Sequence, residues 1–165
     1  MMSIKLRPSS LKNICTLVVD SVRINVKPEV ELKFAKAGAP DTSINTDPYR
    51  VEIVLLNLMS NAVKFTESGS IVLDYDVNGD NTVTFSVTDT GIGVPAEKRK
   101  TIFERFRQID PEAEGTGLGL HVSRLIATLL NGSICLDESY KQGARFLFTI
   151  PVNKPEPAST AEAAL

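Results

Sequence analysis

The stretch from residue 71 to 87 reads IVLDYDVNGDNTVTFSV and decides the fold class. Large apolar residues alternate with smaller or polar ones on both sides of its centre: Ile71, Leu73, Tyr75 and Val77 before it, and Val83, Phe85 and Val87 after it. This alternation is typical of strands with one buried face, and an Asn-Gly pair is a strong hairpin signal. The stretch therefore predicts an antiparallel hairpin that turns at Asn78-Gly79.

The segments around this hairpin predict helices and further strands in mixed order. We expect strands over residues 4–6, 30–34, 42–46, 133–137 and 144–150. Helices are expected from Ser10 to just before Lys27, over residues 48–65 and 117–130, and over a short piece at 97–103. The apolar stripe of the helix over 48–65 is Val51, Val54, Leu55, Leu58, Ala62 and Phe65, and that of the helix over 117–130 is Leu118, Val122, Leu125 and Leu129. This order favours an α+β fold, a two-layer α/β sandwich with helices packed on one face of a mixed β-sheet.

Composition and charge place the chain in a broad class. Its 165 residues are 42% hydrophobic and 23% charged, and 18 Lys and Arg against 20 Asp and Glu leave a net charge of −2. This is globular composition, and the near-neutral balance argues against a nucleic-acid binder. We expect one domain over residues 1–152, followed by a flexible Pro/Ala/Glu-rich tail or linker over 153–165.

The counts of His and Cys exclude several kinds of chemistry. A single His excludes catalytic or zinc sites that need several imidazoles. Cys15 and Cys135 are far apart and stand in the apolar contexts ICT and ICL. This placement predicts two buried, reduced thiols and a cytoplasmic protein.

Three polar residues follow one another on the predicted helix over 48–65. Asn57, Asn61 and Lys64 are four and three residues apart, which puts them on one seam beside the apolar stripe. Asn is a poor helix former, so the seam needs a reason. It is either structural or functional, because an Asn oxygen can coordinate Mg²⁺ and a Lys one turn further can reach a phosphate.

Two glycine-rich segments also look unlike plain core. DTGIG at 89–93 follows a predicted strand, where it is either a simple Asx turn or a close approach to a ligand with an Asp that can accept from an exocyclic amine. GTGLGL at 115–120 opens a predicted helix, where it is either a structural helix cap or an anion site formed by exposed N–H groups, and three glycines in five residues are more than a cap requires. Neither the Walker A motif nor the Rossmann phosphate motif accounts for them.

Taken in order, these segments resemble the ATP-binding catalytic domain of sensor histidine kinases, in the Bergerat (GHKL) ATPase superfamily. NLMSNAVKFT at 57–66 resembles the N box, DTGIG the first Gly box, FERF at 103–106 the F box, and GTGLGL the second Gly box. QGARFLFTIP at 142–151 resembles the closing strand of the domain. The resemblance runs from about residue 4 to 151, and four boxes in this order are a specific signal.

The resemblance implies a site for ATP and Mg²⁺. Asn61 would coordinate the metal, with Asn57 lining the same pocket. Lys64 would contact phosphate, Phe65 would pack near the adenine, and Asp89 would accept from the adenine amino group. Asn57 and Lys64 are the implied catalytic residues. The other implied nucleotide-binding positions are Gly91, Gly93, Gly115, Thr116, Gly117, Leu118 and Gly119.

Asn57 also separates branches of the superfamily. Relatives that hydrolyse ATP, and the anti-sigma serine kinases, resemble E-x-x-x-N at this place, whereas this chain has N-L-M-S-N. A neutral amide cannot take a proton from water or from a hydroxyl, while an imidazole nitrogen already offers a lone pair. The substitution therefore favours phosphorylation of histidine over hydrolysis or serine phosphorylation.

Some positions depart from the family pattern. The segment between Phe106 and Gly115 is short, and Gln108 stands where many members carry an Arg that touches the γ-phosphate. Arg105 and Arg107 either replace that Arg or are solvated charges. These departures keep open a second function, a non-catalytic nucleotide-binding regulatory module.

The single His121 follows the second Gly box and lacks the sequence context of a phosphoacceptor. The resemblance therefore implies a partner: a histidine-containing dimerisation domain, in the parent chain or another chain, and through it a response regulator. Phe103 and Phe106 either dock on that domain or belong to the local core. We expect no nucleic acid partner and no membrane contact by this domain.

Overall fold

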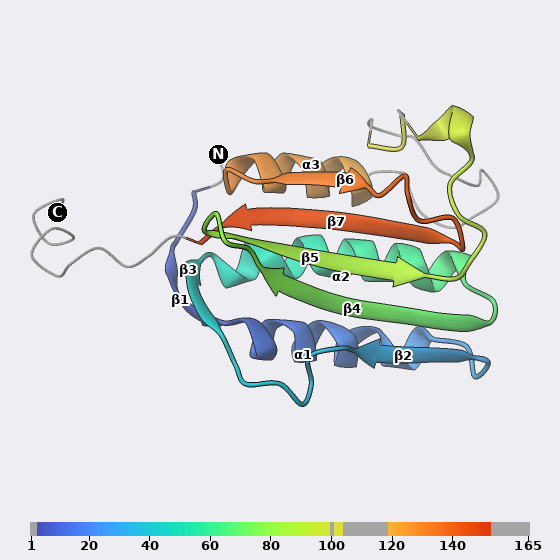
Figure 1. The fold of residues 1–165 in the computed structure, drawn as a ribbon, viewed down its shortest axis with the longest axis horizontal. Coiled ribbons are helices and arrows are strands. Elements are labelled where there is room, and N and C mark those ends of the chain that lie inside the picture. The colour runs from blue at the N-terminus through green and yellow to red at the C-terminus, as the bar shows by residue number, and fades with distance from the viewer. Residues whose placement is uncertain (1–2, 100, 104–118, 153–165) are drawn as a thin grey trace, which may run out of the picture.

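The fold is a mixed five-stranded sheet with three helices packed on one of its faces (Figure 1). The computed structural model describes residues 3–99, 101–103 and 119–152. The strands are β1 (Arg7–Ser10), β2 (Val30–Phe34), β3 (Ser43–Thr46), β4 (Gly69–Val77), β5 (Thr82–Asp89), β6 (Ser133–Leu136) and β7 (Ala144–Pro151). The helices are α1 (Leu11–Val22), α2 (Pro48–Phe65) and α3 (Gly119–Leu129), with single 3-10 turns at η1 (Arg23–Asn25) and η2 (Ala96–Lys98).

The order of strands in the main sheet is β2-β4-β5-β7-β6. Only β2 and β4 pair in parallel, and the other neighbours are antiparallel. The strands β1 and β3 form a separate antiparallel pair. The predicted two-layer α/β sandwich with helices on one face of a mixed sheet is therefore confirmed.

The predicted hairpin forms the centre of this sheet. Val77, at the end of β4, is 52% exposed although the alternation includes it, whereas the inward residues Leu73, Phe85 and Val87 have no exposed surface. They pack against the helices, while the alternate residues of β5 are half-buried on the other face of the sheet. Alternation along each strand thus places one row of side chains in the core, as period-two patterning requires.

The turn of the hairpin differs from the prediction. Asn78 N donates to Thr82 O at 2.8 Å, so the chain reverses over three residues and not at Asn78-Gly79 alone. The left-handed residue is Asn81, at φ 64°, which Asn tolerates better than most residues. This is the common three-residue alternative to a tight Asn-Gly turn.

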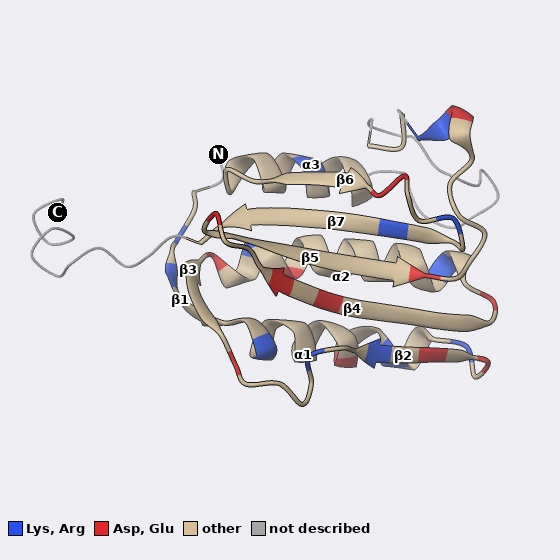
Figure 2. Ribbon diagram, viewed as in Figure 1, with Lys and Arg blue, Asp and Glu red and all other residues tan. Residues whose placement is uncertain are grey.

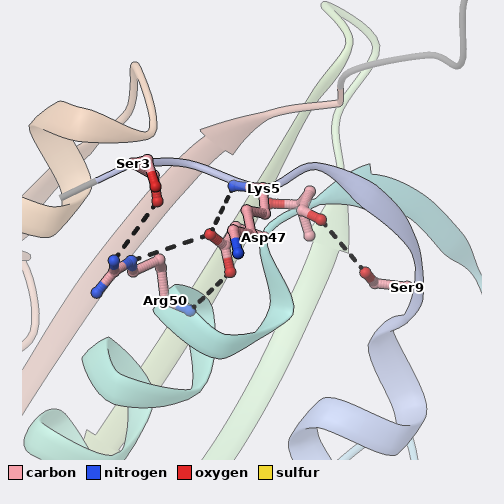
Figure 3. A network of polar contacts seen from close by, with 6 residues as sticks. Ser3, Lys5, Ser9, Asp47 and Arg50 are labelled. Atoms are coloured by element: carbon pink, nitrogen blue, oxygen red, sulfur yellow. Dashed lines mark hydrogen bonds and ion pairs between the residues drawn. The ribbon is translucent and has the colours of Figure 1, made fainter.

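Helix α2 begins and ends as predicted, and its start is held by a polar network (Figure 3). Asp47 is the N-cap: its Oδ1 accepts from Arg50 N at 3.3 Å and its Oδ2 accepts from Lys5 N at 3.0 Å. Pro48 takes the first helical position, where no N–H is needed. Arg50 also donates from Nη2 to Ser3 O at 3.5 Å. This network fixes the helix that carries the polar seam.

The predicted apolar stripe of α3 was wrong. Leu125 and Leu129 are 51% and 42% exposed, whereas the buried residues are Leu120, Ser123, Ile126 and Ala127. Leu118 lies outside the described residues, and Val122 is half-buried. Leucines occupy several faces of this helix, so spacing alone does not select the side that meets α2.

Smaller differences concern the first strand, the short helix and one thiol. The first strand is three residues later than predicted, because residues 7–10 and not 4–6 pair with β3. The predicted helix over 97–103 is only the 3-10 turn η2. Cys15 is buried as expected and burial raises its pKa to about 12, but Cys135 is exposed. Within the described part of the chain, no helix has the length and apolar character needed to cross a membrane.

Candidate functional site

Four elements meet at one edge of the sheet, on the right of Figure 1: the end of α2, the end of β5, and the starts of β7 and α3. Ile92 N donates to Phe65 O at 3.2 Å, which joins the loop after β5 to α2. Asn57 Nδ2 donates to Gly119 O at 3.2 Å, which joins α2 to α3. The structure therefore brings together residues that lie 62 positions apart in the sequence.

Asp89 ends β5 at this edge and is only 4% exposed. Its Oδ1 accepts from Gly91 N at 2.9 Å and from Ala144 N at 3.3 Å. Among the described residues, Oδ2 receives no hydrogen bond. Burial raises the pKa of this carboxyl, and the two N–H groups lower it in part. The first bond is the Asx turn that the sequence left open, and it uses only one of the two carboxylate oxygens.

Glycine is required in this loop because the backbone segments nearly touch. A Cβ on Gly91 would lie 2.0 Å from Phe65 O, and a Cβ on Gly143 would lie 2.0 Å from Asp89 O. Gly93 adopts φ 73°, where side chains are strained. The DTGIG loop is thus pressed against the end of α2 on one side and the start of β7 on the other.

The polar seam of α2 lies beside the buried stripe, as predicted. Asn57 and Asn61 are half-buried, Lys64 is exposed, and Phe65 is half-buried against the core. Within the part of the chain that the structure describes, the side chains of Asn61 and Lys64 make no hydrogen bond or ion pair. An amide and an ammonium group are therefore available to a ligand at this edge.

Ser123 is a residue that the sequence analysis missed. It has no exposed surface, and its hydroxyl lies 3.1 Å from Asn57 Nδ2. Its position four residues after Gly119 is visible in the sequence, but its partner on another helix is not. The sequence alone therefore does not distinguish Ser123 from an ordinary helix residue.

Several predicted positions lie outside the described residues. These are Gly115, Thr116, Gly117 and Leu118 of the second Gly box, together with Arg105, Phe106, Arg107 and Gln108. Gly119 is described, as the first residue of α3. The other F-box aromatic, Phe103, is buried and packs edge-on against Phe146 with ring centroids 5.9 Å apart, so it belongs to the local core. His121 Nδ1 lies 3.4 Å from Phe103 O.

The residues at this edge fit an adenine nucleotide with a divalent cation. Asn57 and Asn61 offer amide oxygens, which are ligands that Mg²⁺ accepts, and Lys64 offers a positive charge. Thr66, at the end of α2, has a buried hydroxyl with no partner among the described residues. Such unpaired groups are uncommon in plain core and often mark a functional site.

Comparison with known proteins shows the family of the chain. Residues 46–154 match the family described as histidine kinase-, DNA gyrase B-, and HSP90-like ATPase. The chain belongs to this family. The matched range includes α2, the central hairpin, the DTGIG loop, α3 and the closing strand.

The curated relatives within this ATPase family are sensor histidine kinases. Sensor histidine kinase RcsC of Salmonella typhimurium is 38% identical over 123 residues, which make up 72% of this chain and 13% of RcsC. Circadian input-output histidine kinase CikA of Synechococcus elongatus is 33% identical over 162 residues, or 90% of this chain and 21% of CikA. The chain thus spans only 13% to 21% of the length of these two relatives.

The solved structures point the same way. Full-length ShkA in complex with AMPPNP superposes with a TM-score of 0.82 at 31% identity, over 94% of this chain and 33% of ShkA. The nucleotide-free catalytic domain of histidine kinase ThkA gives a TM-score of 0.73 at 27% identity, over 90% of this chain and 96% of that domain. By family, fold and relatives, the chain is an ATP-binding catalytic domain of the sensor histidine kinase type.

Proposed function

We propose that this chain binds Mg-ATP and donates the γ-phosphoryl group to a histidine on a separate dimerisation domain. The observation that carries the proposal is Asp89, a buried carboxylate whose two internal hydrogen bonds both end on Oδ1. A buried carboxylate is costly, so an oxygen left without an internal donor calls for a ligand that donates.

In this proposal, Asp89 selects the base. Its Oδ2 accepts a hydrogen bond from the exocyclic amino group of adenine. Guanine carries a carbonyl oxygen at the corresponding position, which would set one acceptor against another. A polar site that is left unpaired by the wrong base discriminates strongly against it.

The polar seam of α2 takes the phosphates. Lys64 is exposed and has no described partner, so its ammonium group can neutralise phosphate charge. Asn61, together with Asn57, supplies amide oxygens to the divalent cation. When bound, Mg²⁺ supplies further charge neutralisation and orients the phosphates. Phe65 packs near the base, and Gly91, Gly93 and Gly119 let backbone approach the nucleotide, as do the glycine-rich residues at 115–118.

The phosphoryl transfer itself requires few reactive groups from this chain. A nitrogen of the acceptor imidazole forms a bond to the γ-phosphorus while the bond from that phosphorus to the β–γ bridging oxygen breaks, and ADP leaves with the electron pair. A neutral imidazole needs no base to attack, which agrees with an amide at position 57 instead of a carboxylate. This chain contributes positioning and charge neutralisation.

The partners follow from the chemistry. The acceptor histidine would belong to a dimerisation domain in the parent chain or another chain, and the phosphoryl group would pass from it to a response regulator. We place this reaction in the cytoplasm, where ATP is supplied. The sensor histidine kinases RcsC and CikA support this assignment by similarity.

The test uses the whole chain and an isolated helical hairpin that carries a candidate phosphoacceptor histidine. With Mg-[γ-³²P]ATP, we expect label on the hairpin that is stable in alkali and lost in acid, as phosphohistidine is. Nucleotide binding without transfer to hairpins from several relatives would favour the regulatory module. Absence of adenine-nucleotide binding at millimolar concentration would refute both functions.

A further inference from the structure

The side chain of Asn57 makes two hydrogen bonds to helix α3. Asn57 Nδ2 lies 3.2 Å from Gly119 O and 3.1 Å from the hydroxyl of Ser123. That hydroxyl in turn donates to Gly119 O at 2.9 Å. Ser123 has no exposed surface, so water does not compete for its hydroxyl, whereas Asn57 is half-buried and Gly119 is exposed. One buried serine therefore closes a three-membered hydrogen-bond ring between two helices.

The chemistry of this ring decides which way the Asn57 amide faces. A backbone carbonyl only accepts, and the hydroxyl proton of Ser123 is already given to Gly119 O. Both atoms therefore need a donor from Asn57, and only the amide nitrogen can donate. The nitrogen faces α3, so Oδ1 faces away from it, and no described residue donates to Oδ1.

An amide oxygen in that orientation can only accept. Phosphate oxygens also accept, so Oδ1 of Asn57 cannot bond to them directly. It can bond to a divalent cation, to a water held by that cation, or to an ammonium group. The partner of Asn57 in a bound nucleotide would therefore be the metal end and not a bare phosphate oxygen.

We propose that Ser123 is a positioning residue that holds Asn57 with its amide oxygen toward the cation of a bound Mg-nucleotide. This inference rests on the proposed nucleotide site and adds a residue and an orientation to it. Without the hydroxyl, Asn57 Nδ2 keeps only Gly119 O, and rotation about the terminal side-chain bond becomes easier. Loss of the hydroxyl should then weaken binding of the metal-bound nucleotide and leave binding of the base unchanged.

The experiment compares Mg-ADP with ADP in EDTA, by calorimetric titration of the full 165-residue chain. We expect Ser123→Ala to weaken Mg-ADP binding about fivefold to tenfold, the loss of one hydrogen bond, and to change metal-free ADP binding less than about twofold. Ser123→Cys refills the space with a weak hydrogen-bonding group and should behave as the alanine variant does. It separates the hydrogen bond from packing.

The matched control is Ser21→Ala. Ser21 makes the same bond to the fourth preceding carbonyl, Leu17 O at 2.7 Å, but is exposed on α1. This control should leave both affinities unchanged. Equal losses of Mg-ADP and ADP affinity, or unchanged Mg-ADP affinity in both Ser123 variants, would overturn the inference. A wild-type chain that binds neither would instead refute the proposed nucleotide site.

Discussion

At the scale of single residues, the proposed site depends on how Asp89 divides its two oxygens. Oδ1 is committed to the N–H groups of Gly91 and Ala144. Both are donors, so any side chain at position 89 must present an acceptor to them. This requirement fixes what the other atom of the side chain can be.

Asp89→Asn should therefore abolish most adenine-nucleotide binding. The carboxamide oxygen would be held by the two N–H groups, which forces the NH₂ group toward the ligand, donor against donor. We expect affinity for ADP to fall about 100-fold, equivalent to about 2.8 kcal/mol and typical of a hydrogen bond to a charged group. Calorimetry measures the affinity, and the melting temperature without ligand should not fall.

The matched control for this variant is Asp74→Asn. Asp74 also stands in the central hairpin, but it pairs with Lys36 at 2.7 Å on the face away from the helices. Its substitution should leave ADP affinity unchanged. Equal losses in both variants would mean that the effect of Asp89→Asn is not local.

Asp89 also predicts opposite pH effects on stability and on binding. Burial raises its pKa in the folded chain above the ordinary 3.8, so the fold favours the protonated form. Its contribution to stability is full below the unfolded pKa and is lost as pH rises through the folded pKa. Binding runs the other way, because a protonated carboxyl cannot accept from an amine at that oxygen.

As pH rises from the ordinary 3.8 through the raised pKa of folded Asp89, nucleotide affinity should thus rise, while the nucleotide-free chain loses stability relative to Asp89→Asn. Thermal melts of both proteins across this range, with and without ADP, measure the two effects. A constant difference in melting temperature between the two proteins would contradict the raised pKa.

At the scale of elements, the site depends on the close contact between the DTGIG loop and the end of α2. Gly91→Ala would bring a methyl group to within 2.0 Å of Phe65 O, so backbone must move. We expect ADP affinity to fall about tenfold, or about 1.4 kcal/mol. Gly79→Ala is the control, because nothing lies within 4 Å of its added methyl. Equal affinities in the two variants would mean that loop placement does not matter.

Helix α3 offers a second test, because its buried face is not the one that its leucine spacing predicts. Ile126 is 1% exposed and its neighbour Leu125 is 51% exposed. Ile126→Ala should lower the free energy of unfolding by about 2–4 kcal/mol, and Leu125→Ala by less than about 0.5 kcal/mol. Urea unfolding of both variants measures this. If Leu125→Ala were the more destabilising of the two, the buried face of α3 would instead be the stripe predicted from the sequence.

These elements show where sequence reasoning succeeds and where it stops. Helix α2 was predicted to the residue because its apolar spacing is regular from Val51 to Phe65 and Pro48 stands at its start. The central hairpin was found because its alternation is strict. The face of α3 was not, since leucines occur on several of its sides. Local pattern identifies an element, but contacts with other elements choose its buried face.

The site divides in the same way. The chemical types of Asn57, Asn61, Lys64 and Asp89 could be read from spacing and from family resemblance. Their hydrogen-bond partners could not be predicted in this way. Ala144 N, which donates to Asp89, is 55 residues away in the sequence, and Ser123, which accepts from Asn57, is 66 residues away. Hydrogen bonds over such separations are set by the tertiary fold.

At the scale of the whole molecule, a different group of residues lies at each end of helix α2. The proposed nucleotide site lies where α2 ends. A separate cavity of about 590 Å³ lies where α2 begins, lined by Lys5, Arg7, Asp47 and Arg50 among others. Both signs of charge are spread over the described elements (Figure 2). The distribution of charge therefore does not indicate which of the two ends binds the nucleotide. The local hydrogen-bond donors and acceptors indicate it.

The most direct test of the nucleotide site is a titration of the ¹⁵N-labelled chain with Mg-ADP, followed by amide chemical shifts. We expect the largest shifts at Asn61 to Phe65, at Asp89 to Gly93, and at Gly119 and Ala144. The amides around Asp47 and Arg50 should remain unchanged. Shifts centred on that opposite cavity, with the Asp89 loop unaffected, would contradict the proposed nucleotide site.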